Sequence, residues 1–288
     1  MNPSVPGFLF PYILFATFAT LASLLFGLNR SLTIANWPPR QRRSTVWSAA
    51  ALLAIFYIAA LLPARSAFYS GGRIPTIPFG LLVPIVVGIA LFLWWRPFRR
   101  VVEAVPQQWL IGIQFYRTLG VIFLILYAAD KLPAQFAWPA GAGDVLVGLL
   151  APLVALAHIR KGPRANSLVR AWNLFGIADL VVATTTGFLT SPSPLQMLAL
   201  DNPNRLITQY PLVMIPVFLV PIAILLHLAS LQKLRQSEST QSASVFTPRQ
   251  ASHAQSIREG DLTFSTANNS ASGEIATDIH INKRKQSI

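Results

Sequence analysis

The sequence predicts an all-α protein: a bundle of seven transmembrane helices with its N-terminus outside and its C-terminus in the cytoplasm, followed by a disordered tail. Three observations predict this fold. Hydrophobic residues make up 53% of the 288 residues and charged residues only 11%, which is typical of membrane proteins. Seven apolar runs are long enough to cross about 30 Å of hydrocarbon. Lys and Arg alternate in abundance between the loops that join those runs.

The apolar runs place all seven expected spans before residue 232. The first, residues 8–28, follows a start without Lys or Arg, which favours a retained helix over a cleaved signal peptide. The other six are expected at residues 46–62, 79–95, 109–129, 143–158, 171–189 and 211–231. Several are close to the shortest length that crosses a bilayer, so their ends are defined less sharply than their centres.

Loop charge gives the expected orientation. The loops after the first, third and fifth spans hold eleven Lys and Arg, whereas those after the second, fourth and sixth hold four. Basic residues accumulate in short cytoplasmic loops, so the odd-numbered loops are expected inside. All seven tryptophans lie at or just beyond span ends, where indole rings sit among lipid headgroups. The net charge of +13 therefore indicates a lipid bilayer as the partner and not nucleic acid.

Residues 232–288 differ in composition from the expected transmembrane domain, residues 1–231. They are rich in Ser, Thr, Gln and Asn and have no sustained hydrophobic periodicity. Such a segment buries too little apolar area to offset its ordering entropy, so we expect a disordered cytoplasmic tail. The chain has no cysteine, which excludes disulfides, thiolate metal sites and a cysteine nucleophile.

Small residues fall four apart on the first span, at Ala19, Ser23 and Gly27. A stripe of this kind lets two helix backbones approach closely. Its partner is either a second copy of the chain, which would make the protein a homo-oligomer, or a neighbouring helix of the same bundle.

A carboxylate, Asp179, lies in the middle of the sixth span, where it is costly unless it is paired, protonated or functional. It is nine residues from Arg170 at the inner face, a depth of roughly 13 Å. Arg117 is nine residues from Gln108 at the inner end of the fourth span. We therefore predict that Arg117 and Asp179 face each other, either as a structural ion pair or as a gate or substrate site.

His227 is expected about 9 Å into the inner leaflet on the seventh span. We expect it to hydrogen-bond a neighbouring helix or to join Arg117, Asp179 and Asn173 as a titratable member. His158 lies at the inner end of the fifth span, and two imidazoles on different spans leave a haem or metal site as an alternative. The prediction is that the protein holds no metal and no cofactor.

Asp144 ends the segment PAGAGD, in which Gly141, Gly143 and Asp144 match the GxGD pattern of intramembrane aspartyl proteases. The valine that follows is similar to the motif of prepilin peptidases. That resemblance implies a catalytic dyad of Asp144 and Asp179 sharing one proton. Depth argues against the dyad, because Asp144 lies about sixteen residues from the inner face and Asp179 about nine, a mismatch of roughly 10 Å. Asp144 is therefore expected to be an intramembrane polar residue or a helix cap.

Prolines recur at intervals of five in the seventh span, at Pro211, Pro216 and Pro221. Pro211 can begin the helix, whereas each of the other two removes a backbone donor and clashes with the preceding turn. We expect a kinked helix, which serves either as a hinge or cation site or as a static bend satisfied by its neighbours.

The C-terminal third carries the pattern WNLFGIADLVVATTTGFL followed by YPLVMIPVFLVPIAILLHLASL. It resembles a recurring pattern in uncharacterised bacterial multi-pass membrane proteins. The resemblance implies a bacterial inner membrane and brings no assigned activity. Walker, HExxH, GxSxG and dinucleotide-binding motifs do not occur in the sequence.

These features leave three classes of function open. The leading hypothesis is a small transporter or permease-like protein that binds a small molecule or ion at a polar site of Arg117, Asp179, Asn173 and His227, with Arg117 as the fixed cation. The second is a non-catalytic membrane scaffold or sensor, in which the charge pair is structural. The third is a membrane-embedded enzyme, either an aspartyl protease or a haem protein.

Overall fold

The structure is a computed structural model that describes residues 5–66, 68–70, 76–162 and 164–239. Its chain divides into a compact unit, Met1–Leu234, and a second segment, Arg235–Ile288. The described residues form helices and turns and contain no strand. The prediction of an all-α fold is confirmed.

Seven helices in the described residues are long and apolar enough to cross a membrane, and each overlaps the expected span of the same order. The first three are α1 (Leu9–Ile34), α2 (Pro39–Arg65) and α3 (Ile77–Trp94), and the short helix α4 (Arg96–Ala104) follows them. The fourth span, Gln107–Ala128, consists of α5 (Gln107–Gly112), a 3-10 segment η1 (Ile113–Gly120) and α6 (Val121–Ala128). The last three are α7 (Ala134–Ile159), α8 (Ala165–Thr190) and the helix Ile215–Ser239, which begins with the π-helical turn η3 (Ile215–Leu219).

Several helices are longer than their apolar runs predict. Helix α7 begins nine residues before the expected residue 143, directly after Pro133, and α8 begins six residues before the expected residue 171. Hydropathy detects only the apolar centre of a helix, whereas backbone hydrogen bonds continue through polar residues at its ends. The earlier start of α8 changes the depth of residues that are counted from that end, such as Asp179.

The seventh helix begins and ends later than expected. Pro211 lies in a turn before the helix, which starts with the π-helical turn that contains Pro216, so the expectation that Pro211 begins the helix is wrong. At the other end the helix continues to Ser239, eight residues into the segment expected to be a disordered tail. The remainder of that expected tail, residues 240–288, lies outside the described residues.

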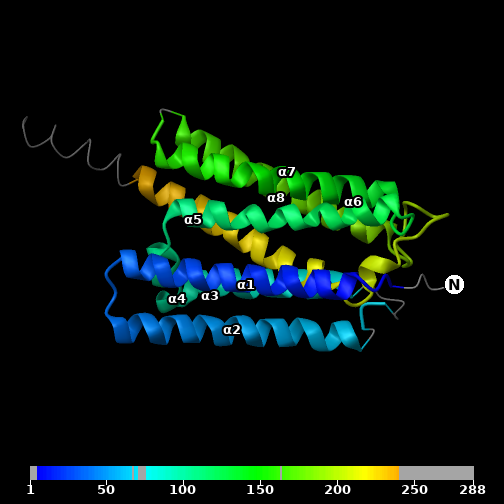
Figure 1. The fold of residues 1–288 in the computed structure, drawn as a ribbon, viewed down its shortest axis with the longest axis horizontal. Coiled ribbons are helices and arrows are strands. Elements are labelled where there is room, and N and C mark those ends of the chain that lie inside the picture. The colour runs from blue at the N-terminus through cyan, green and yellow to red at the C-terminus, as the bar shows by residue number, and fades with distance from the viewer. Residues whose placement is uncertain (1–4, 67, 71–75, 163, 240–288) are drawn as a thin grey trace, which may run out of the picture. The chain divides into compact units, whose positions relative to one another are not determined.

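The seventh helix is also the most buried of the seven, with 61% of its most apolar window inside the protein. Figure 1 shows it, in yellow and orange, between two groups of helices: α1, α2 and α3 on one side, and the fourth span, α7 and α8 on the other. Its fully buried Phe218 contacts the rings of Phe56 and Tyr57 from α2. On α1, Gly27 packs against the indole of Trp109, so this member of the small-residue stripe serves packing within the bundle.

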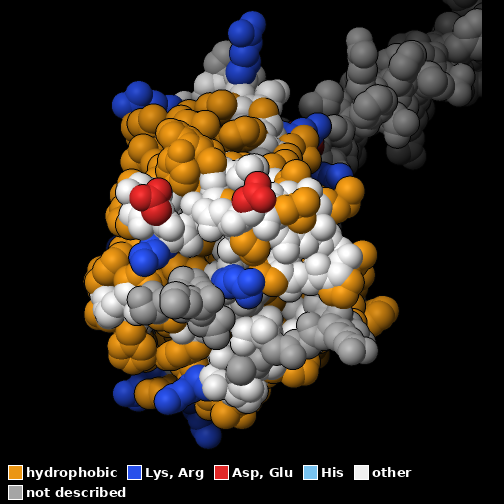
Figure 2. Space-filling model, turned by 90° about the vertical axis from the view of Figure 1, so that its right-hand side faces the viewer, with side chains coloured by type: hydrophobic (Ala, Val, Ile, Leu, Met, Phe, Trp, Pro, Cys, Tyr) orange, Lys and Arg blue, Asp and Glu red, His pale blue; other side chains and the backbone are white. Residues whose placement is uncertain are grey.

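The two ends of the unit differ in charge. At the end where α1 begins, which we call the N-terminal end, Figure 2 shows acidic as well as basic side chains among hydrophobic and neutral ones. At the opposite end lie most of the basic side chains, and we call it the basic end. Its members lie in or beside the loops after α1, α3 and α7: Arg30, Arg40, Arg42, Arg43, Arg96, Arg99, Arg100, Arg160, Lys161, Arg164 and Arg170.

Candidate functional site

A buried arginine joins two aspartates in the middle of the helices. Arg117, in η1, is only 3% exposed. Its Nε donates a hydrogen bond of 2.7 Å to Oδ1 of Asp144, and its Nη2 lies 2.6 Å from the same oxygen. Nη2 also contacts Oδ2 of Asp179, and Nη1 donates to the carbonyl of Gly176 at 3.3 Å. Every guanidinium nitrogen therefore has a partner, which a charge buried from water requires.

The predicted contact between Arg117 and Asp179 is present, but the expected difference in depth between Asp144 and Asp179 is wrong. Asp144 lies fifteen residues before the end of α7 at Ile159, and Asp179 lies fourteen residues after the start of α8 at Ala165. The two acids are thus level, and both reach the same guanidinium. The difference arises at Asp179, because α8 begins at Ala165, about a turn and a half before Arg170.

A second series of hydrogen bonds runs from Arg117 toward the basic end. His227, fully buried, lies with Nε2 at 3.2 Å from Nη1 of Arg117 and with Nδ1 at 2.9 Å from Oδ1 of Asn173. The Asn173 amide nitrogen donates to Oγ of Ser230 at 2.8 Å, and Gln107 Nε2 donates to the same Oγ at 2.7 Å. We call these five residues the polar chain.

The polar chain defines the protonation of His227. Because a guanidinium nitrogen only donates, Nε2 of His227 must accept, and the ring is then neutral with its proton on Nδ1. That proton is directed at the oxygen of Asn173, which leaves the Asn173 nitrogen free to donate to Ser230. Arg117, His227, Asn173 and Ser230 thus form a series in which each side chain donates a hydrogen bond to the next.

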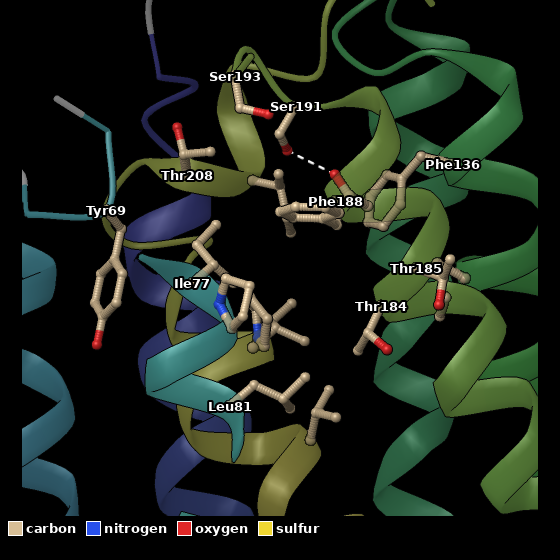
Figure 3. A pocket seen from close by; sticks show the side chains of 18 of the residues that line it. Tyr69, Ile77, Leu81, Phe136, Thr184, Thr185, Phe188, Ser191, Ser193 and Thr208 are labelled. Carbon is tan, nitrogen blue, oxygen red and sulfur yellow. Dashed lines mark hydrogen bonds between the residues drawn. The ribbon is translucent and has the colours of Figure 1, made fainter. Parts of the chain in front are cut away.

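A cavity of about 500 Å³ reaches Asp144 from the N-terminal end. Asp144 is among its lining residues, and the loop residues Ser193, Arg205 and Thr208 line its mouth. Figure 3 shows Ile77 and Leu81 of α3 on one side of it and Thr184 of α8 on the other. The walls combine aromatic rings, aliphatic side chains and hydroxyl groups, and the aromatic members are Tyr69, Phe123, Phe136 and Phe188.

Two of the three spans that carry the polar chain, the fourth and the seventh, depart from regular α-helix where they meet. The 3-10 segment η1 holds Arg117, and the π-helical turn η3 opens the helix that holds His227. Two side chains of η1 donate across to that helix, Tyr116 to the carbonyl of Leu219 and Gln114 to the carbonyl of Ala223, each at 3.0 Å. Irregular turns inside membrane helices survive only where neighbours satisfy the backbone, and they recur at functional sites.

Three glycines provide the space that the two aspartates and His227 occupy. A methyl group on Gly143 would overlap the carboxylate of Asp179, and one on Gly120 would overlap the side chain of Asp144. One on Gly176 would overlap the imidazole of His227. The glycine of the GAGD segment next to Asp144 thus accommodates the second aspartate, which accounts for the motif by packing.

The geometry does not match an aspartyl protease or a haem protein. A protease dyad holds the attacking water between its carboxyls, whereas here the Nη2 of Arg117 contacts both Asp144 and Asp179. A haem ligand needs a free ring nitrogen, and both ring nitrogens of His227 are engaged. Within the described ranges, His, Asp and Glu do not gather in groups of three that would suit a metal ion.

The polar chain includes residues that the sequence does not single out. Gln107 and Ser230 have no distinguishing motif, although Gln107 and Gln114 are seven residues apart, as are their partners Ala223 and Ser230. Two glutamines seven residues apart on one apolar segment are a signal that this face of the segment meets another helix, although the acceptor at Ala223 is a backbone carbonyl that the sequence does not mark. Gln107 and Gln114 also carry buried side-chain oxygens that accept no hydrogen bond within the described residues.

The fold and the site define a class: a multi-pass helical membrane protein with a charge cluster buried among its helices. The chain belongs to a family known as a domain of unknown function (DUF8737), which matches residues 74–235 and so covers more than half of the 288 residues. The matched region contains the whole polar chain, Asp144 and Asp179. No curated protein and no solved structure matches the chain.

Proposed function

We propose that the protein is a small transporter or permease-like protein of a bacterial inner membrane, which takes up a small molecule or ion in the cavity and passes it along the polar chain. One observation carries the proposal: the cavity and the polar chain meet at Arg117 and Asp144, and together they run from the N-terminal end to the basic end. Polar groups at membrane depth are costly, and a pathway for a substrate or an ion is one of the functions for which they are kept.

The polar groups along the cavity and the polar chain support passage of a polar solute. The cavity offers the hydroxyls of Thr184, Ser191 and Thr208, and the polar chain continues with donors and acceptors on four further side chains. The free oxygens of Gln107 and Gln114 are acceptors that a moving solute or water can use. The irregular turns η1 and η3 lie at the junction of the two parts, where a transporter must change conformation.

A membrane scaffold or sensor is the second candidate, and the completeness of the network favours it. All nitrogens of Arg117 and both nitrogens of His227 have partners, as in a clamp that only locks four helices together. In that case the cavity would bind a signalling molecule or a lipid chain. The hydrogen bonds of the polar chain would then never break to let a solute pass.

Cysteine accessibility separates the two candidates without knowledge of the solute. The chain contains no cysteine, so single variants need no altered background. With Thr184→Cys in the cavity and Ser230→Cys in the polar chain, a membrane-impermeant maleimide is applied from each side of oriented vesicles. A transporter labels at Thr184→Cys from the N-terminal end and, in a second conformation, at Ser230→Cys from the basic end.

The matched control is Val182→Cys, on the same helix as Thr184 but exposed toward lipid, which should remain unlabelled from both sides. If Ser230→Cys stays protected in the wild-type background and in Asp144→Asn, where the charge cluster is weakened, the route does not open. The scaffold or sensor is then the better description.

A further inference from the structure

We propose that the floor of the cavity binds one monovalent cation at a time, either a proton or the cationic group of an organic solute, and that the two compete at the carboxylate of Asp144. The proposal rests on the proposed function and names its substrate class: a lipophilic organic cation exchanged for a proton.

Charge is unbalanced in the buried cluster. Two carboxylates, Asp144 and Asp179, share one guanidinium, so the group carries one negative charge in excess. Arg117 is 3% exposed and Asp144 is 9% exposed, so water does little to screen that charge. A low-dielectric interior favours its neutralisation by one positive charge, which a proton or a bound cation supplies.

The surrounding groups do not supply this charge. His227 accepts from Arg117 through Nε2 and is therefore neutral. The tyrosines nearest the cluster, Tyr12 on α1 and Tyr116 on η1, donate their hydroxyls to the carbonyls of Leu119 and Leu219. In the cavity, Tyr69 is neutral, and Arg205 lies exposed in a loop at the mouth.

Asp144 is the acid that a solute can reach. It lines the cavity, and the N–H groups of Arg117 that bind it end on Oδ1; no hydrogen bond reaches its Oδ2 from the residues described. Asp179 is not among the residues that line the cavity, and one of its carboxylate oxygens lies against Gly143. A proton on Asp144 therefore exchanges with the cavity more directly than one on Asp179.

The walls of the cavity select what else can bind. Most of the residues that line it are apolar, and aromatic rings from α6, α7 and α8 line the same cavity as Asp144, at Phe123, Phe136 and Phe188. Aromatic faces attract cations, and apolar walls favour a cation with hydrocarbon substituents over a hydrated metal ion. The exchange balances: the cation enters, the O–H bond of the Asp144 carboxyl breaks, and its proton leaves through the cavity to solvent.

Binding of tetraphenylphosphonium to the purified full chain tests this proposal, with tetraphenylborate as a probe of the same shape and opposite charge. Calorimetry at pH 6 and pH 8, in two buffers of different ionisation enthalpy, counts the protons released. We expect tighter phosphonium binding at pH 8, release of about one proton per cation where the site starts protonated, and no comparable binding of the borate. Equal binding of the two probes, or affinity independent of pH, overturns the proposal.

Two variants locate the site. Asp144→Asn keeps the shape of the side chain and leaves one carboxylate, that of Asp179, for one guanidinium. Phosphonium affinity at pH 8 should therefore fall at least tenfold and lose its pH dependence. Thr184→Phe narrows the cavity without touching the charges, so it should weaken phosphonium binding even if Asp144→Asn does not fold. Unchanged affinity in Thr184→Phe would place the cation elsewhere and refute the assignment.

Failure of this proposal is distinguishable from failure of the proposed function. If phosphonium does not bind but Ser230→Cys becomes labelled from the basic end, the protein transports something other than an organic cation. If phosphonium binds with proton release but Ser230→Cys stays protected, the cavity is a cation receptor and not a transport route.

Discussion

Arg117 is the residue on which the interior depends. It brings a positive charge to the centre of an apolar bundle, where an arginine on a lone helix costs about 3 kcal/mol or more. Asp144 from α7 and Asp179 from α8 offset that cost, and the carbonyl of Gly176 takes a further N–H. The arginine therefore ties three spans together through charge, in a medium where hydrophobic burial gives little preference for one helix contact over another.

The ratio of two acids to one base predicts unequal effects of substitution. Arg117→Leu leaves two buried carboxylates without a partner and should lower the free energy of unfolding by about 3–5 kcal/mol. Asp179→Asn leaves Arg117 paired with Asp144 and should cost far less. Thermal unfolding in detergent measures both. Adding Asp144→Asn and Asp179→Asn to Arg117→Leu should recover much of the loss, and equal losses for Arg117→Leu and Asp179→Asn would contradict the arrangement.

At the scale of the helices, glycine determines how closely the elements approach. Gly176 on α8 lies against the ring of His227, and Gly143 on α7 lies against Asp179, so charged and polar side chains fit where a methyl group would not. Gly148 likewise brings α7 onto the backbone of η1 at Thr118. Small residues allow this approach in membrane helices, where close packing is a main source of association energy.

Two glycine substitutions should act in opposite directions. Gly176→Ala places a methyl group into the His227 ring and near Nη1 of Arg117, and overpacking of this kind costs about 1–3 kcal/mol. Gly112→Ala is the control, because a methyl group there meets no neighbouring atom within 4 Å and raises helix propensity. Thermal unfolding of each variant in detergent measures the difference. Comparable unfolding temperatures for the two variants would show that α8 has room to move away from His227.

The elements also show which parts of the site hydropathy can and cannot locate. The centres of the seven helices follow from their apolar runs, and the meeting of Arg117 with Asp179 follows from their similar depth. The participation of Asp144 does not, because the depth of Asp179 relative to Asp144 depends on where α8 begins, and α8 extends through polar residues before its apolar run. The link from His227 to Asn173 depends on the rotation of two helices about their axes, which uniformly apolar segments do not specify.

At the scale of the whole molecule, the distribution of Lys and Arg predicts its orientation in the membrane. Basic side chains gather at the basic end, whereas the N-terminal end carries both signs of charge (Figure 2). We expect the basic end to face the cytoplasm. The cavity then opens to the outside of the cell, which is the side from which solutes are taken up or to which they are expelled.

Truncation fusions test the orientation in a bacterial host. Alkaline phosphatase needs disulfides and is active only outside the cytoplasm. Fused after Asp201, in the loop at the N-terminal end, it should be active, and fused after Lys161, in the loop at the basic end, it should be inactive. A fluorescent protein at the same two sites is the control and should give the opposite result. Activity of the phosphatase after Lys161 would invert the orientation and the direction of the proposed route.

The sequence by itself determined that the protein is helical, how many apolar spans it has, and that an arginine and an aspartate meet among them. Those features follow from the length of apolar runs and from charges too costly to leave apart in an apolar medium. Only the tertiary structure decided that a second aspartate joins Arg117, that His227 continues the chain toward Ser230, and that a cavity ends at Asp144. These depend on where each helix ends and how it is turned, and apolar residues around the whole circumference of a helix encode neither.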